Sequence, residues 1–286
     1  MILRKSFFSL LLSVLFFGLQ AQETTVYTEA NLAYHRGLEF FNQNLYGQAQ
    51  TEFRQAIELL RPINEPEWNG LRTDAELHHA KCAVRLEQPE AEKLVFDFLR
   101  DNSPSPVASE AALEIGDFYF QKKEYERALT YYDMVPETGG NRDEIRFKQG
   151  YSYFVKKNFG QAKAHLRPLT EDTGSAYYDA ANYYYGCSAF FEKKYDEAAK
   201  AFKRCENSPN YRQYAPYYLI QIYSAKKEYD QVITYGAPKA ADNSVKNRPE
   251  INQIVGQAYF EKGDFKKALP YLEYAANNGV NLRPAD

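Results

Sequence analysis

Residues that could carry catalytic or metal chemistry are few and scattered in this 286-residue chain. Of its four histidines, His78 and His79 are adjacent on an expected helix, so their side chains point about 100° apart and do not converge on one zinc ion. The three cysteines show no Cys-x-x-Cys spacing, and no nucleophile-elbow, phosphate-loop or dinucleotide-binding glycine pattern occurs. We therefore predict no catalytic residue, no metal site, no cofactor and no enzymatic activity.

Aromatic side chains are the chemistry that this sequence has in excess. It holds 25 Tyr and 19 Phe against a single Trp. Such side chains provide large contact areas at low entropic cost, and Tyr and Trp are enriched where proteins bind one another. The formal net charge of −3 and the pI of about 5.9 lack the basic field that nucleic acids require. The composition favours binding and predicts no nucleic-acid partner.

The first 21 residues have the pattern of an export signal. Arg4 and Lys5 precede an apolar run over residues 6–17, and the small Ala21 precedes Gln22. The run is shorter than the roughly 20 residues that span a bilayer, and no cysteine near Ala21 could accept a lipid. The alternatives are an uncleaved anchor or a buried N-terminal helix. The pattern resembles bacterial export signals ending in Ala-Gln, which are common in the Bacteroidetes.

We expect cleavage after Ala21 and no transmembrane segment in the mature protein, because no second apolar stretch of spanning length follows. The mature chain would then be exported, and either periplasmic or associated with the outer membrane.

The remaining chain repeats one frame. Residues 116–129 align with residues 256–269, and the same frame recurs at residues 150–163 and 186–199 and more loosely at 37–50 and 220–233. A small residue of the frame returns at intervals of 34 or 36 residues, at Ala128, Ala162, Ala198, Val232 and Ala268. Each unit has apolar residues at helical spacing on both sides of a short turn, which predicts two helices per unit. The predicted hairpins cover approximately residues 30–63, 73–101, 109–136, 143–169, 179–206, 213–238 and 249–278.

This helical hairpin, with its pattern of small and aromatic residues, resembles the tetratricopeptide repeat (TPR). The resemblance covers about residues 27–282; it is strong around Gly116, Gly150, Gly186 and Gly256, and poor for residues 64–106. It implies an all-α fold, a right-handed superhelical α-solenoid of about seven hairpins. Because no capping helix follows the last hairpin, we expect the chain to continue beyond residue 286, with Leu272, Tyr274 and Ala275 facing solvent. The alternative is a natural end capped by a short helix or a partner.

Two departures from the frame carry structural expectations. Ile220 stands where other units have a small residue, and Gly236 stands where they have a large one, so this hairpin should pack with exchanged volumes.

Lysine pairs, such as Lys156-Lys157, fall in successive turns. They could form a basic ridge, but solvated turn residues flanked by acidic side chains are the favoured interpretation.

In the TPR family, the first helix of each hairpin lines a concave groove that binds peptides or partner helices. Matching frames place eight residues of this chain there: Phe147, Tyr151, Phe154, Tyr183, Phe190, Tyr214, Tyr217 and Gln221. The resemblance therefore implies a non-catalytic protein-interaction scaffold of the cell envelope, with a protein or peptide partner and a place in an outer-membrane or cell-wall complex. Two alternatives stay open: the aromatics only pack against one another, or they stack on sugars in a glycan- or polysaccharide-binding module.

Overall fold

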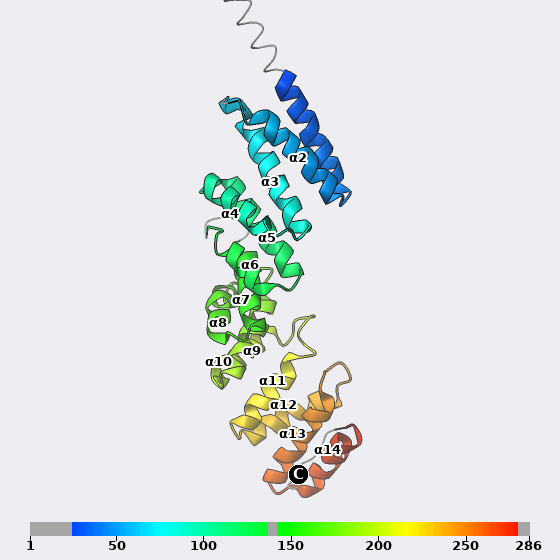
Figure 1. The fold of residues 1–286 in the computed structure, drawn as a ribbon. Helices are drawn as coiled ribbons and strands as arrows, with labels where there is room; N and C mark the ends of the chain where they lie inside the picture. Colours follow the sequence, from blue (N-terminus) through cyan, green and yellow to red (C-terminus); the bar gives the residue numbers. More distant parts are fainter. Residues whose placement is uncertain (1–24, 64, 137–141, 280–286) are drawn as a thin grey trace, which may run out of the picture. The chain divides into compact units, whose positions relative to one another are not determined.

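The computed structural model describes residues 25–63, 65–136 and 142–279, and the regular structure in these ranges is helical (Figure 1). A first helix covers residues 25–42. It is followed by α2 (Tyr46–Leu60), η1 (Pro66–Trp68), α3 (Asn69–Arg85), α4 (Ala91–Asn102), α5 (Pro106–Gln121), α6 (Tyr125–Tyr132), α7 (Arg142–Val155), α8 (Phe159–Leu166), η2 (Arg167–Thr170), α9 (Tyr178–Phe191), α10 (Tyr195–Cys205), α11 (Ala215–Ala225), α12 (Tyr229–Ala241), α13 (Arg248–Glu261) and α14 (Phe265–Asn277). None of the described helices is both long and apolar enough to cross a membrane.

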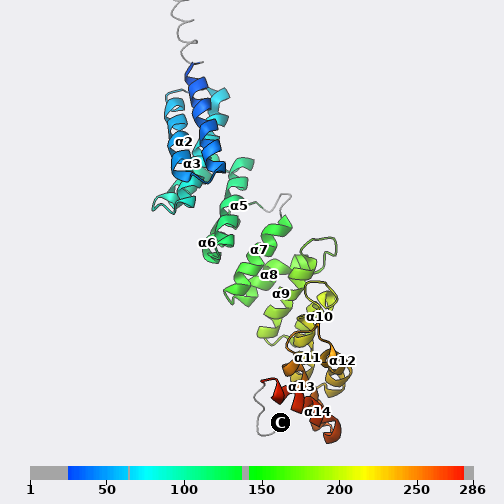
Figure 2. The same ribbon diagram turned by 90° about the vertical axis from the view of Figure 1, so that its right-hand side faces the viewer.

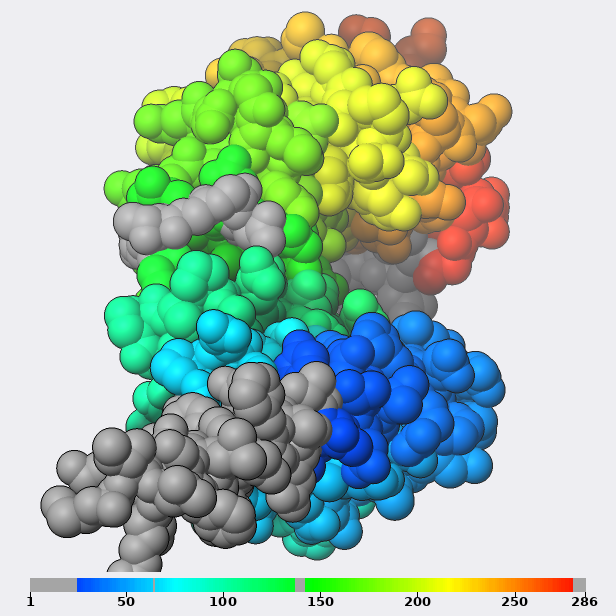
Figure 3. Space-filling model, turned by 90° about the horizontal axis from the view of Figure 1, so that it is seen from above, coloured from blue at the N-terminus to red at the C-terminus, as the bar shows by residue number. Residues whose placement is uncertain are grey.

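Consecutive helices pack in pairs, which gives seven hairpins over the described residues. The chain divides into two compact units, and the division falls within α5, between Phe118 and Tyr119. In unit 1 the surfaces of helix 25–42 and α2 adjoin, both in shades of blue (Figure 3). In unit 2 the helices from α7 to α14 follow one another side by side (Figure 2). The expected all-helical, repeated architecture is confirmed. The predicted signal peptide, residues 1–21, lies outside the described residues.

A small residue on the first helix of a hairpin faces a large residue that follows 16 positions later on the second helix. A Cβ added at Gly37, Gly150, Gly186 or Gly256 would lie 2.6, 2.5, 3.0 or 2.8 Å from the nearest side-chain atom of its partner. The couples are Gly37–Phe53, Gly150–Leu166, Gly186–Phe202 and Gly256–Leu272. Real Cβ atoms do not approach so closely in a close-packed interior, so the absent side chain lets the two helices meet.

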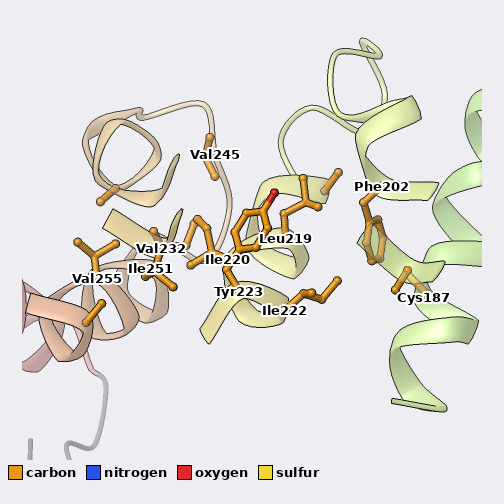
Figure 4. Packing of buried hydrophobic residues seen from close by; sticks show 14 of the residues in the cluster. Cys187, Phe202, Leu219, Ile220, Ile222, Tyr223, Val232, Val245, Ile251 and Val255 are labelled. Carbon is orange, nitrogen blue, oxygen red and sulfur yellow. The ribbon is translucent and has the colours of Figure 1, made fainter. Parts of the chain in front are cut away.

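The sixth hairpin reverses this couple, as the sequence predicted. Ile220 on α11 is fully buried, and its partner 16 positions later is Gly236 on α12. A Cβ at Gly236 would lie 3.5 Å from Ile220 Cγ1 and 2.8 Å from Val255 Cγ2 of the next hairpin. Figure 4 shows Ile220, Val232, Ile251 and Val255 in this part of the core. In this hairpin the large residue is on the first helix and the small residue is on the second, and the spacing of 16 residues is unchanged.

The expectation that Leu272 and Ala275 face solvent is wrong. Leu272 is buried because it covers Gly256 of its own hairpin, and Ala275 is fully buried. Tyr274 is half-buried, with the Arg248 guanidinium 5.4 Å from its ring centroid. The exposed apolar side chains of this hairpin are instead Phe265 (59% exposed) and Leu269 (56%) on the first turns of α14, and Phe260 (41%) near the end of α13. The sixth hairpin also runs further than expected, because α12 passes through Pro238 and ends at Ala241.

Each hairpin turn contains one residue with a positive φ angle. These residues are Asn44, Glu87, Lys123, Lys157, Lys193, Lys227 and Gly263, with φ between 54° and 78°. The next N–H donates to the carbonyl five residues back, as Asn158 donates to Tyr153 at 2.9 Å. This is the Schellman ending of a helix, which satisfies carbonyls that the helix itself leaves free. The second lysine of the pairs Lys122-Lys123, Lys156-Lys157 and Lys226-Lys227 therefore occupies a left-handed turn position, whereas in Lys193-Lys194 the first lysine does.

In the pairs Lys156-Lys157 and Lys226-Lys227, the first lysine reaches back to an acid at the start of the second helix of the preceding hairpin. Lys156 pairs with Glu126, and Lys226 pairs with Asp196 at 2.7 Å. Lys262, which precedes the turn glycine of the last hairpin, pairs with Asp230 in the same way. The acids are 85–89% exposed, so each pair contributes little stability. These lysines are flanked by acids, which agrees with the favoured interpretation of the turns.

A charged cluster ties α8 to the hairpin of α9 and α10. The buried Lys163 ammonium lies 2.7 Å from Glu192 and 3.1 Å from Glu197. The Tyr185 hydroxyl donates a hydrogen bond to Glu197 Oε1. Burial alone would raise the pKa of Glu197, but the hydrogen bonds from Tyr185 and Lys163 outweigh it, so this pKa is lowered. The hydrogen bonds from Lys163 and Lys194 also lower the pKa of Glu192.

A carboxylate whose pKa is lowered by folding stabilises the fold above its unfolded pKa, and this contribution is lost as the pH falls through the folded value. We expect Glu197→Gln to lower the melting temperature at pH 7. The difference from the wild type should shrink as the pH falls from 7 towards 3, because the wild-type carboxyl takes up its proton as the pH passes through the lowered pKa. The control Glu126→Gln changes an exposed surface pair and should shift stability by less than about 0.5 kcal/mol at either pH. A Glu197→Gln effect that stays constant from pH 7 to pH 3 would contradict this account.

Candidate functional site

The eight predicted binding residues lie on three successive first helices of unit 2. Helix α7 carries Phe147, Tyr151 and Phe154, helix α9 carries Tyr183 and Phe190, and helix α11 has Tyr214 at its N-cap followed by Tyr217 and Gln221. The spacing of three, four or seven residues places them on one side of each helix. Every one is at least partly exposed.

Tyr184 joins the rings of α7 to those of α9. Its ring centroid lies 4.9 Å from that of Tyr151, 5.2 Å from Phe154 and 6.2 Å from Phe147. Tyr151 extends these contacts to Tyr125 on α6, at 5.9 Å. The distances and the tilted or edge-to-face angles are those that aromatic pairs prefer.

Tyr183 joins α9 to α11 and to the segment before it. Its ring is stacked on Tyr211 at 4.6 Å and lies 6.4 Å from Tyr214 and 6.1 Å from Tyr218. Tyr218 in turn contacts Phe190 at 5.4 Å and Tyr217 at 5.8 Å. Gln221, which has no aromatic ring, is half-buried on α11. The rings thus form one connected surface, which we call the aromatic stripe; it comprises Phe147, Tyr151, Phe154, Tyr183, Tyr184, Phe190, Tyr211, Tyr214, Tyr217 and Tyr218.

Sequence reasoning missed three members of the aromatic stripe: Tyr184, Tyr211 and Tyr218. Tyr184 and Tyr218 each follow a predicted residue directly and point about 100° further around the helix, toward a neighbouring hairpin. The signal was present, because aromatic residues occupy both positions in each doublet. Tyr211 lies in the segment before α11, where helical spacing gave no guidance.

The part of the stripe on α9 and α11 is apolar and almost uncharged. Helices α9 and α11 together carry a single charged side chain, Asp179. Burial raises the pKa of Tyr211 and Tyr218 to about 12, and it also raises the pKa of Tyr183 and Tyr184. These phenols therefore stay neutral at physiological pH and can donate hydrogen bonds.

The described residues provide no group of three or more His, Cys, Asp or Glu side chains that could hold a metal ion. Cys187 and Cys205 are buried free thiols, and burial raises the pKa of Cys187 to about 12. Such thiols are poor nucleophiles, since the thiolate is the reactive form. Cys187 lies beside Phe202 in the core (Figure 4). The chemistry of the surface is therefore contact through rings and hydroxyl groups.

A family model described as a tetratricopeptide repeat matches residues 89–142. The match includes part of residues 64–106, where the sequence pattern resembles the tetratricopeptide repeat least. Together with the paired helices over the described residues, this match supports an all-helical, TPR-like repeat fold. Proteins of this class are generally non-catalytic scaffolds. No curated protein matches the sequence.

Several solved structures share the fold. The C-terminal part of a TPR repeat-containing protein from Cytophaga hutchinsonii is 18% identical, covers 88% of this chain and 97% of its own, and has a TM-score of 0.55. YrrB, described as a TPR protein with an unusual peptide-binding site, is 16% identical over 64% of this chain and 91% of its own, with a TM-score of 0.52. MamA is 24% identical over 62% and 98%, with a TM-score of 0.51. At these identities the similarity concerns the fold alone.

Proposed function

We propose that this chain is a non-catalytic scaffold that binds a peptide or helix of a protein partner on its aromatic stripe. The observation that carries the proposal is the continuity of the stripe: ring contacts run from Tyr125 through Tyr151, Tyr184 and Tyr183 to Tyr218 without a break. Three hairpins together therefore present one apolar surface edged by neutral hydroxyls. YrrB supports the proposal to the extent that this fold can carry a peptide-binding site.

The stripe favours an uncharged or apolar segment as its ligand. A charged side chain docked over α9 and α11 would lose water without gaining an opposite charge, because Asp179 is the only charged residue on these two helices. Tyrosine adds contact area with few rotamers to freeze, and its hydroxyl can bond to a peptide carbonyl. The same rings could stack on sugars, so a glycan ligand is the competing proposal and forms one arm of the test.

The members of the stripe differ in how much they pack. Tyr183 contacts five rings, including the buried Phe202 at 6.0 Å, so its truncation will destabilise the fold. Tyr214 is 41% exposed and contacts Tyr183 only, and Tyr217 contacts Tyr218 only, among the ring contacts of the described residues. Binding can therefore be separated from packing by replacing Tyr214 and Tyr217 together.

We expect Tyr214→Ala/Tyr217→Ala to abolish capture of a partner from envelope extract while it lowers the melting temperature by only a few degrees. Hot-spot aromatics contribute about 2 kcal/mol or more each, so the double loss corresponds to a weakening of about a thousandfold. Partners are identified by mass spectrometry and confirmed with purified protein, beside a glycan array. The control Tyr153→Ala removes a tyrosine that is stacked on His165 and lies outside the stripe. Undiminished partner binding by the double variant, or binding of glycans alone, would contradict the proposal.

We also propose that the protein is exported and acts in the cell envelope, in the periplasm or at the outer membrane. The support is the basic, apolar and small-residue pattern of residues 1–21. Protein recovered from the periplasm should have the intact mass of a chain that begins at Gln22 and carries no lipid. Retention of residues 1–21 in the recovered protein would contradict cleavage.

A further inference from the structure

A cavity of about 390 Å³ lies in unit 1 between α2, α3 and α4. It shares no residue with the aromatic stripe. Ile57 of α2 and Phe98 of α4 give it an apolar lining. The polar side chains around this lining are Arg54, Glu58, Arg61, Glu76, His79, Asp97, Asp101 and Asn102. Its volume falls in the range of about 300 to 1,000 Å³ that small-molecule sites occupy, and a few polar groups on an apolar lining are typical of such sites.

The α2 wall presents the guanidinium groups of Arg54 and Arg61, with the side chain of Glu58 between them in the sequence. Arg54 and Arg61 are seven residues apart, so they lie two turns apart on one side of the helix. Neither forms a hydrogen bond or ion pair within the described residues. The opposite wall is different: Arg100 holds both Asp97 and Asp101 at 2.8 Å. The carboxylates of α4 are thus already neutralised, while the arginines of α2 can take an anionic group.

The α3 side supplies two further groups with no hydrogen bond in the described structure. Burial raises the pKa of Glu76, although Arg72 and Arg61 oppose this. Nε2 of His79 is buried without a hydrogen-bond partner. Burial, followed by the charge of Arg54, lowers the pKa of His79, so its neutral ring can donate or accept one bond. A buried polar atom left unpaired is unfavourable, and a hydrogen bond from a ligand would remove that cost.

We propose that this cavity binds a small zwitterion with an apolar body, of dipeptide size. Its carboxylate pairs with Arg54 and Arg61, its ammonium pairs with Glu76, and its apolar side chains lie on Ile57 and Phe98. A plain anion would meet the carboxylates of Glu58 and Glu76, and a plain cation would meet two arginines. A molecule with both charges matches both walls, because paired charges compensate for the water that each group loses.

Four probes separate these possibilities by isothermal titration of the full chain: L-leucyl-L-leucine, its N-acetyl form, its C-terminal amide, and the form blocked at both ends. We expect the free dipeptide to bind at least tenfold more tightly than each of the three blocked forms. Equal affinity of all four would show that only the apolar lining acts and would overturn the proposal. Absence of binding by the free dipeptide at millimolar concentration would overturn it as well.

Variants locate the site. Arg54→Gln/Arg61→Gln and Glu76→Gln should each weaken binding of the free dipeptide at least tenfold, and melting curves show whether the variants stay folded. In the control Arg36→Gln, the arginine belongs to a surface pair with Glu52 at 2.8 Å, outside the cavity, and affinity should be unchanged. Wild-type affinity in the double arginine variant would overturn the assignment to this cavity. The stripe variant Tyr214→Ala/Tyr217→Ala should bind the dipeptide normally, so the two proposals can fail independently.

Discussion

Gly150→Leu should cost the protein more than about 3 kcal/mol of unfolding free energy. A Cβ at this position would lie 2.5 Å from Cγ of Leu166, which is fully buried, and 3.3 Å from the carbonyl oxygen of Ala162. The leucine can turn aside only into a filled core, and the backbone of α8 cannot move without separating the hairpin. Overpacking of this kind typically costs about 1 to 3 kcal/mol for a few methylene groups, and leucine adds four carbons at a contact with no free space.

The matched control is Gly160→Leu in the same hairpin. Gly160 is exposed on α8, and a Cβ there would meet nothing within 4 Å. Because glycine disfavours a helix by about 1 kcal/mol, this substitution should be neutral or slightly stabilising. Thermal and urea unfolding of both variants measure the difference; 3 kcal/mol corresponds to a fall in melting temperature of roughly 6 to 12 °C. Similar melting temperatures for the two variants would show that the couple is not in close contact.

The second large effect concerns the exchanged couple of the sixth hairpin. Gly236→Leu should lose about 3 kcal/mol or more, because it forces a side chain against Ile220 and Val255. Ile220→Gly should lose about 3 to 5 kcal/mol through the cavity and the added glycine in α11. The double variant restores the order that the other hairpins have. We expect it to be more stable than the sum of the single effects by about 1 to 3 kcal/mol.

The recovery will be partial, because Val255 belongs to the next hairpin and lies closer to Gly236 than Ile220 does. The control cycle combines Ile220→Gly with Gly150→Leu, which lies two hairpins earlier. Those effects should add within about 0.5 kcal/mol, as distant sites do. Urea unfolding gives all the required free energies. Simple additivity in the 220/236 cycle would contradict the exchange of volumes.

The fold could be predicted from the sequence because each small–large pair of a hairpin can be recognised from the sizes of its two residues. A glycine followed 16 positions later by Phe or Leu is visible in the bare chain, and so was the exchange of Ile220 and Gly236. The end of the chain was harder to predict. Leu272 was expected to face solvent, although the same couple buries it against Gly256. The spacing of 16 residues relates Leu272 to Gly256. The expectation that Leu272 faces solvent was based instead on the lack of a further hairpin after the last one.

The sequence predicted which helices carry the aromatic stripe, but it did not predict all of the residues that belong to it. Helical spacing shows which side of α9 holds Tyr183, but it does not show that Tyr184 turns to α7 while Tyr183 turns to Tyr211. That choice depends on the distance between hairpins, which no local pattern records. The unit 1 cavity was missed for a related reason: its arginines become notable only once the structure shows which acids are already paired. Whether the stripe binds a partner stays a prediction.

The 16-residue couples also have a kinetic consequence. Closing so short a segment costs little chain entropy, since the cost grows only with the logarithm of its length. Each hairpin can therefore form its own small–large contact before any distant part of the chain arrives, and local contacts of this kind favour rapid folding. Folding can begin at any couple and spread to its neighbours. A chain built in this way does not depend on one nucleus, so a defect at Gly150 should leave the hairpin of Gly256 and Leu272 free to form first.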